Sequence, residues 1–277
     1  MLELLPLLFG LVVGLALGLT GGGGSVFAIP LLVFGLHMNV HEAVTLSLAT
    51  VTVVAAIGCS NAARNRLVDF RAGGIFALAG IVAAPFGVML ADRLSEKNLL
   101  LAFSVLVIAV ALTMWRKASR NAVNSRVVRA NFVDPAAPEG GAICQLNPDT
   151  AALRLTAPCS VVLAFTGLIT GVLSGLFGVG GGFVIVPALT FVTQLSIHRA
   201  VATSLFVIAL VGGSGVVSGF VAGREIPWLI AGIFLVGGVG GLFAGQLVAS
   251  RLAGPTLQKT FAVSMLVLGV VTIAAKL

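Results

Sequence analysis

Long stretches of the chain carry no charged side chain, and short polar stretches separate them. Aspartate, glutamate, lysine and arginine are absent from 4–41, 43–63, 72–91, 98–115, 155–198, 200–223 and 226–250. A helix of about twenty apolar residues crosses the hydrocarbon core of a bilayer. Only helices and closed barrels satisfy their own backbone polar groups there. The pattern therefore predicts an all-α polytopic membrane protein.

This pattern divides the chain into three parts. Residues 1–115 form a first transmembrane repeat, 116–157 a polar, basic connector, and 158–277 a second transmembrane repeat. Each repeat opens with a long apolar segment, and three helices follow it. We expect the opening segments at 4–36 and 158–193, and the helices near 42–62, 72–91, 98–115, 200–222, 227–249 and 257–276.

The two membrane parts are copies of each other. Residues 14–48 align without a gap with 171–205, and fourteen of the thirty-five positions are identical. A further match aligns 73–94 with 231–252 at a shift of one residue. Such an internal duplication is frequent in membrane transporters. The identical pairs include Gly21/Gly178, Gly23/Gly180, Gly24/Gly181, Pro30/Pro187, His41/His198 and Ser47/Ser204.

The opening segment is too long for one crossing and slightly short for two. Thirty-three helical residues would extend roughly 50 Å, whereas the hydrocarbon core is about 30 Å thick. The glycine cluster splits the first copy into pieces of about seventeen and twelve residues, so each repeat has four or five membrane segments. A broken or re-entrant opening helix fits either count. We favour inverted over parallel repeats because broken helices paired about an in-plane axis are a recurrent transporter design.

Composition supports the membrane assignment. Hydrophobic residues make up 58% of the chain and charged residues 9%, with a mean hydropathy of +1.15. Soluble domains carry about 25% charged residues. The net charge of +7 is concentrated, since six of the sixteen basic residues lie in 116–157. By the positive-inside rule this connector is cytoplasmic, and nucleic acid is not an expected partner.

The glycine clusters are the first candidate site. Backbone that leaves a helix within the membrane needs protein, water or a ligand to satisfy its N–H groups. Glycine lets those groups approach an ion, and the half-helices starting near Ser25 and Phe183 would direct their positive dipole ends at it. This favours an anion. Close helix packing is the alternative, preferred for Gly14, Gly18, Gly171 and Gly175. The substrate-binding candidates are Thr20, Gly21, Gly22, Gly23, Gly24, Ser25, Gly178, Gly180, Gly181 and Gly182, with Pro30 and Pro187 as hinges.

Three kinds of polar side chain complete the candidates. His41 and His198 precede the next helix in each repeat and could donate to an anion, carry a proton or cap the helix. Ser47 and Ser204 follow six residues later, where a hydroxyl binds either a ligand or its own backbone. Asn61 is the candidate polar residue of a pore.

The absence of other groups narrows the chemistry. None of the charge-free spans holds a carboxylate, which disfavours a metal site, cation transport and a carboxylate proton relay. Three cysteines without metal-like spacing predict neither zinc nor a disulfide framework, and no cofactor is expected. Proton coupling would then run through the histidines or the substrate. An intramembrane enzyme using His and Ser lacks a carboxylate to orient the base, and a passive channel is the other alternative.

The glycine-rich blocks ending at Pro30 and Pro187, the His-x-Ala-Val-x-x-Ser-Leu strings and the third helices ending Arg-Leu resemble the sulfite exporter TauE/SafE family of membrane permeases. The resemblance implies a transporter in the bacterial inner membrane for small sulfur-containing anions: sulfite, sulfonates or sulfonated carboxylates. A transporter for another small anion is the alternative. The expected partners are this anion, the lipid bilayer and a second copy of the chain. The first cluster departs from the family's usual Gly-x-Gly-Gly-Gly pattern, which 178–182 keeps.

Overall fold

The computed structural model describes residues 4–128, 156–193, 197–223, 227–249 and most of 262–272. The prediction of an all-α polytopic membrane protein is confirmed, because six helices in this part of the chain are long and apolar enough to cross a bilayer. The elements are α1 (Leu4–Thr20), α2 (Gly24–Pro30), the π-helix η1 (Leu31–Gly35), α3 (Val40–Arg64), α4 (Phe70–Arg93), α5 (Glu96–Val128), α6 (Ala157–Phe177), α7 (Gly182–Val192), α8 (Ile197–Val221) and α9 (Trp228–Ala249).

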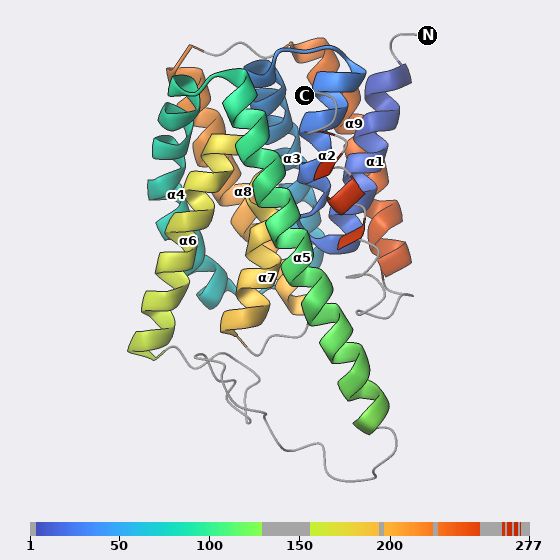
Figure 1. Cartoon of the computed structure of the whole chain (residues 1–277), viewed down its shortest axis with the longest axis vertical. Coiled ribbons are helices and arrows are strands. Elements are labelled where there is room, and N and C mark those ends of the chain that lie inside the picture. Colours follow the sequence, from blue (N-terminus) through green and yellow to red (C-terminus); the bar gives the residue numbers. More distant parts are fainter. Residues whose placement is uncertain are drawn as a thin grey trace.

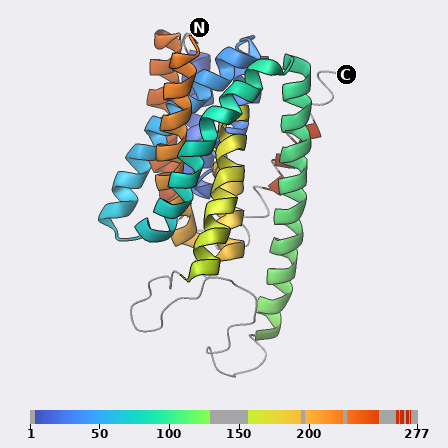
Figure 2. The same ribbon diagram turned by 90° about the vertical axis from the view of Figure 1, so that its left-hand side faces the viewer.

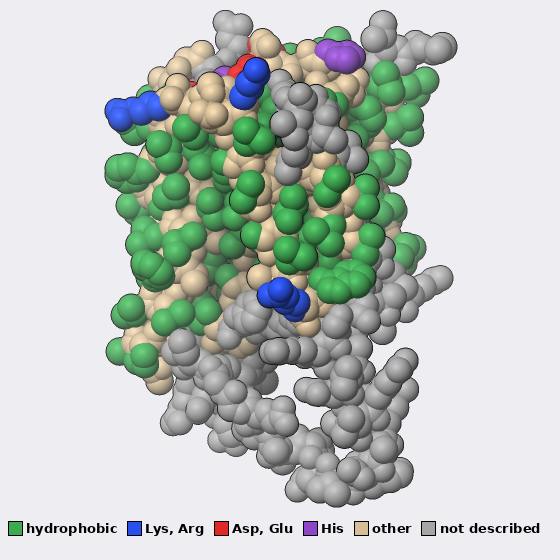
Figure 3. Space-filling model, in the orientation of Figure 1, with side chains coloured by type: hydrophobic (Ala, Val, Ile, Leu, Met, Phe, Trp, Pro, Cys, Tyr) green, Lys and Arg blue, Asp and Glu red, His purple; other side chains and the backbone are tan. Residues whose placement is uncertain are grey.

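Large apolar side chains face outward along the middle of the molecule. On α4, Leu78, Val82 and Phe86 are spaced by four residues and are 68%, 64% and 64% exposed. Figure 3 shows hydrophobic side chains over the middle of one face, with charged side chains near its upper and lower margins. An apolar surface of this extent is stable against lipid and not against water.

Each opening segment is a pair of helices joined at its glycine cluster. The first pair has 17 residues in α1 and 7 plus 5 in α2 and η1, matching the predicted pieces. In Figure 1, α1 runs away from the end where the N-terminus is marked, whereas α6 runs toward it. The helices α3 and α8 also run in opposite directions (Figures 1 and 2). Equivalent helices of the two copies therefore run in opposite directions.

The opening helix of each half packs against a helix of the other half: α1 lies against α9, and α6 lies against α4. Glycines spaced by four residues let the backbones touch, because a Cβ at any of them would overlap the facing backbone. This agrees with the close-packing interpretation of these glycines. The contacts are reciprocal: Gly10, Gly14 and Gly18 of α1 meet Phe234, Gly238 and Leu242 of α9, and Gly167, Gly171 and Gly175 of α6 meet Phe76, Gly80 and Ala84 of α4.

Between these two helix pairs lie α3 and α8, which pack against each other and against α4 and α9 (Figure 1). Their facing side chains form the core of the molecule, in which Leu46 and Leu205 are fully buried. The short helices α2 and α7 contact this central pair. The glycine-rich breaks that precede α2 and α7 are thereby held inside the protein.

Two expectations need correction. The helix expected at 98–115 is longer than expected, because α5 continues to Val128 and so extends into the range expected as the connector. Cys159 is disulfide-bonded, contrary to the expectation from cysteine spacing; its partner lies outside the described residues. Residues 129–155 of the connector and most of the last predicted helix, 257–276, also lie outside the described part of the chain.

Candidate functional site at the glycine-rich breaks

The two glycine-rich breaks touch each other in the interior. A side chain at Gly22 would overlap the backbone of Gly182, and one at Gly182 would overlap Gly22. All residues from Gly21 to Ser25 and from Gly178 to Gly182 are buried. The sequence prediction that both clusters interrupt helices and lie within the protein is therefore correct, and the structure brings them together.

In the first break, the hydroxyls of Thr20 and Ser25 hydrogen-bond to backbone groups of the glycine cluster. The Thr20 hydroxyl donates to the Ala16 carbonyl at 2.7 Å and accepts from the Gly23 N–H at 2.9 Å. The Ser25 hydroxyl donates to the Gly22 carbonyl at 2.8 Å. Gly21 adopts a φ of 73°, which L side chains rarely adopt. This break is internally hydrogen-bonded.

The second break depends more on glycine conformation. Gly178, Gly180 and Gly181 have φ values of 65°, 65° and 67°. The Gly178 N–H donates to the Ser174 carbonyl at 2.9 Å and closes the end of α6. Gly181 is the N-cap of α7, and its carbonyl accepts from the N–H groups of Val184 and Ile185 at 2.9 and 3.0 Å. No side-chain hydroxyl caps this helix start.

The equivalent serines behave differently. The Ser204 hydroxyl donates to the Gly21 carbonyl and to the Val201 carbonyl of its own helix, so it links α8 to the first break. The Ser47 hydroxyl is buried and has no hydrogen-bond partner in the described part of the chain. Buried polar groups without partners are rare in proteins and need an explanation.

The structure does not bring the two histidines together. His41 is the second residue of α3 and His198 the second residue of α8, and these helices begin at opposite ends of the molecule (Figure 1). His41 is partly buried, and its Nδ1 atom has no hydrogen-bond partner among the residues that the structure describes. His198 is exposed. A single site that contains both histidines is excluded in this conformation.

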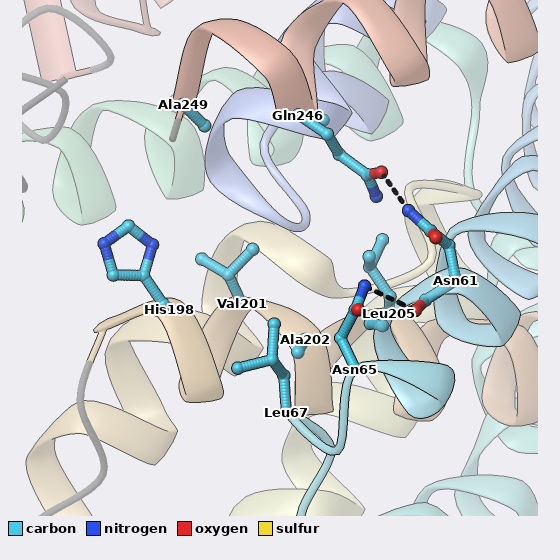
Figure 4. A pocket seen from close by; sticks show the side chains of 11 residues that line it. Asn61, Asn65, Leu67, His198, Val201, Ala202, Leu205, Gln246 and Ala249 are labelled. Carbon is cyan, nitrogen blue, oxygen red and sulfur yellow. Dashed lines mark hydrogen bonds between the residues drawn. The ribbon is translucent and has the colours of Figure 1, made fainter. Parts of the chain in front are cut away.

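His198 and Asn61 instead line a cavity of about 280 Å³ between α1, α3, α8 and α9 (Figure 4). The Asn61 side-chain amide donates to the Gln246 Oε1 atom at 3.0 Å, which joins the two halves across the cavity. The Asn65 amide donates to the Asn61 carbonyl at 3.1 Å. Gly18 also lines the cavity, so it lies next to the first break. The cavity lies at the end of the molecule that holds the α3–α4 loop, because Asn65 and Leu67 of that loop also line it.

Sequence reasoning missed three residues of this region. Apart from Trp228, Gln246 is the only residue of α9 whose side chain can form hydrogen bonds. A lone polar side chain in an apolar helix was the signal that could have identified it. Asn65 lies just after α3. Ser174 is the third of the hydroxyls at Thr166, Thr170 and Ser174, whose spacing of four residues places them on one face of α6.

The described residues contain no group of three His, Cys, Asp or Glu side chains that could hold a metal ion. The buried carboxylate Asp69 precedes α4 and caps it, accepting from the backbone N–H groups of Arg71 and Ala72 at 3.1 Å each. The donors around the breaks are hydroxyls and backbone N–H groups. Such a donor set suits an anion better than a hard cation.

Comparison with known proteins gives a consistent result. The profile of the family described as "Sulfite exporter TauE/SafE" matches residues 6–272. A "Probable membrane transporter protein" of Xylella fastidiosa (strain Temecula1) is 33% identical over 244 residues, 87% of this chain and 82% of the relative. The "Probable membrane transporter protein YunE" of Bacillus subtilis (strain 168) is 25% identical over 269 residues, 94% of this chain and 93% of the relative. No solved structure matches significantly.

Proposed function

Because the chain belongs to the sulfite exporter TauE/SafE family and is a multi-pass membrane transporter, we propose that it is a secondary carrier for small sulfur-containing anions. Sulfite, simple sulfonates and sulfonated carboxylates are the substrate class. The family description supports this choice, and the curated relatives are described as probable membrane transporters.

The contact between the two breaks is the observation that carries the proposal. Two helices begin inside the protein, at Gly24 and Gly182. Gly22, just before the first of these helices, lies against Gly182, the first residue of the second. The first N–H groups of a helix have no partner within the helix, and its dipole is positive at that end. Discontinuous helices of this kind bind anionic groups at the midplane of transporters.

Alternating access follows from the arrangement of the halves. The breaks, together with Pro30 inside α2 and Pro187 inside α7, provide positions where the backbone can bend. The cavity beside Gly18 gives a path to the first break from one end of the molecule. In this proposal the structure corresponds to a conformation whose cavity is open at that end while both breaks are still buried.

We propose that this end faces the cytoplasm of a bacterial cell and that the protein lies in the inner membrane. The described residues there are mostly basic, whereas acidic residues balance the basic ones at the opposite end. The disulfide at Cys159 is the observation against this orientation, because disulfides persist in oxidising compartments. Arg64, Arg66, Arg71, Arg116, Arg199 and Asp69 lie at the first end, and Glu42, Asp92, Arg93, Glu96 and Lys97 at the other.

The test is uptake of radiolabelled sulfite, and then of methanesulfonate, into proteoliposomes that contain the purified protein. Saturable uptake that related sulfur anions inhibit would support the carrier. A comparison with and without a pH gradient would show whether protons drive it. Uptake of other small anions in the absence of any sulfur-anion uptake would remove the proposed substrate class and retain the transporter.

A further inference from the structure

We propose that the anion binds at the second break and not at the first, and that the hydroxyls of Ser47 and Ser174 are its side-chain ligands. This inference rests on the proposed function, in that it assumes a small anion as substrate. It goes further by assigning unequal roles to two duplicated breaks and by adding Ser174.

The hydroxyls of Ser47 and Ser174 are both buried and both lack a hydrogen-bond partner among the described residues. Ser47 is 0% and Ser174 1% exposed. A buried hydroxyl without a partner is costly, because the hydrogen bonds that it made to water are lost and not replaced. Most serines and threonines among the described residues avoid that cost by donating to a carbonyl three or four residues earlier, as Thr50 and Thr170 do. Ser47 and Ser174 therefore lack the usual alternative partner.

Ser47 faces the second break from α3. Its neighbours Val44 and Val51 lie on the same helical face, three residues before it and four after it. The space that a Cβ of Gly178 would occupy is filled by Val44, and the corresponding space at Gly180 lies 3.5 Å from the Val51 side chain. The Ser47 hydroxyl thus lies between two contacts that α3 makes with this break.

Ser174 approaches the same break from α6. Its Cβ atom lies 3.5 Å from the position that a Cβ of Gly181 would take, and Gly181 is the N-cap of α7. Its carbonyl already holds the Gly178 N–H, so the side chain is positioned within the turn that ends α6. The hydroxyls of Ser47 and Ser174 therefore flank the start of α7 from two helices.

The first break offers no equivalent set. The counterpart of Ser174 in the first repeat is Leu17, which is fully buried in the apolar core. The counterpart of Ser47 is Ser204, whose hydroxyl is occupied by the Gly21 carbonyl. The whole hydroxyl stripe is confined to α6, since Thr166 and Thr170 correspond to apolar Phe9 and Val13. Of these hydroxyls, only those of Ser47 and Ser174, at the second break, have no partner among the described residues.

The chemistry of the donors identifies the ligand class as a small oxyanion. Two hydroxyls and the first N–H groups of α7 can donate to several oxygens of one ion, and the dipole of this 11-residue helix favours negative charge. Sulfite or a sulfonate group satisfies this set, as phosphate or sulfate would. Because both hydroxyls are buried in this conformation, entry of the ion requires α3 or α6 to move away from α7.

The test measures anion affinity in the purified full-length protein by the rise of its unfolding temperature with anion concentration. The probes are sulfite, methanesulfonate, sulfate, phosphate and acetate. The variants are Ser47→Ala and Ser174→Ala. The control is Thr166→Val, which removes a hydroxyl that is bonded within its own helix at 2.8 Å. Ser204→Ala tests the first break directly.

For the anion that stabilises the wild type, we expect Kd to rise at least about tenfold in Ser47→Ala and in Ser174→Ala, because hydrogen bonds to charged groups are lost. Thr166→Val and Ser204→Ala should stay within about threefold of wild type. Without anion, both Ala variants should unfold at the wild-type temperature or above it, since an unpaired buried hydroxyl is removed. A structural role for either serine would lower this temperature.

Three results would overturn the inference: unchanged affinity in both Ala variants, an equal loss in Ser204→Ala, or no stabilisation of the wild type by any oxyanion. Sulfite binding that both Ala variants retain would contradict the inference alone and leave the proposed function standing. Binding of phosphate or sulfate but not of sulfite or methanesulfonate, with loss in both Ala variants, would keep the inference and remove the proposed substrate class.

Discussion

Gly22 in the first break lies directly against Gly182 in the second, so closely that a methyl group on either would overlap the backbone of the other. These residues are not equivalent by duplication, since Gly22 corresponds to Val179 and Gly182 to Ser25. The contact therefore depends on glycine at two independent positions. It is the point where the interrupted helices of the two halves meet.

A methyl group at this contact should destabilise the protein. Gly22→Ala forces the two breaks apart, and overpacking of a close-packed interior costs typically about 1–3 kcal/mol. We expect a lower unfolding temperature and reduced transport in proteoliposomes. Gly74→Ala is the matched control, because a Cβ at Gly74, also within a repeat, meets nothing within 4 Å. Equal stability of the two variants would contradict the close contact.

The amide pair at the cavity should couple the two halves energetically. We expect Asn61→Leu and Gln246→Leu each to alter the transport rate, and the double variant to add little to either single variant, because both remove the same hydrogen bond. A coupling free energy of about 0.5–1.5 kcal/mol is expected from a double-mutant cycle of stability. Asn65→Ala serves as control, since its amide bonds only to the preceding turn. Fully additive effects would show that Asn61 and Gln246 act separately.

Asp69 should be important for stability because it performs two tasks. Its carboxylate caps α4, and its backbone N–H donates to the Thr203 hydroxyl of the other half at 3.0 Å. Loss of the cap in Asp69→Ala should cost about 0.5–2 kcal/mol in thermal unfolding, whereas Asp69→Asn should retain most of the stability because asparagine is also a good N-cap. If Asp69→Asn were as damaging as Asp69→Ala, the negative charge and not the cap would be needed.

Thiol labelling should establish the orientation in the membrane. In a Cys59→Ser background, Asn65→Cys in the α3–α4 loop and Ala222→Cys after α8 place exposed thiols at opposite ends of the molecule. In intact cells, a membrane-impermeant maleimide should modify the thiol at 222 and spare the one at 65. The reverse pattern would place the basic end outside the cell and would accord with the disulfide at Cys159.

Helix positions could be predicted from the sequence where charges mark the membrane boundary. The helices expected at 42–62 and 72–91 extend over Val40–Arg64 and Phe70–Arg93, within two residues at each end. The extension of α5 to Val128 could not be predicted, since a helix that leaves the bilayer loses the hydrophobic signal on which the prediction relied. Hydropathy reports burial in lipid and not helicity itself.

The site was predictable in composition but not in geometry. The glycine clusters are visible in the sequence, and their contact at Gly22 and Gly182 is a tertiary feature. Identical residues also acquired different surroundings. His41 and His198 align in sequence, yet opposite helix directions place them at opposite ends. Ser47 and Ser204 align as well, but only Ser204 reaches a carbonyl of the facing break.

The exchange of opening helices between the halves also governs how the protein is assembled during synthesis. The helix α9 against which α1 packs begins more than two hundred residues after α1 ends. At usual translation rates of about 5–20 residues per second, α1 waits ten seconds or more for its permanent neighbour. During that time its glycine face at Gly10, Gly14 and Gly18 is open to other helices in the bilayer. The newly inserted first half is therefore the stage at which this chain is most exposed to mispairing and to quality-control proteases.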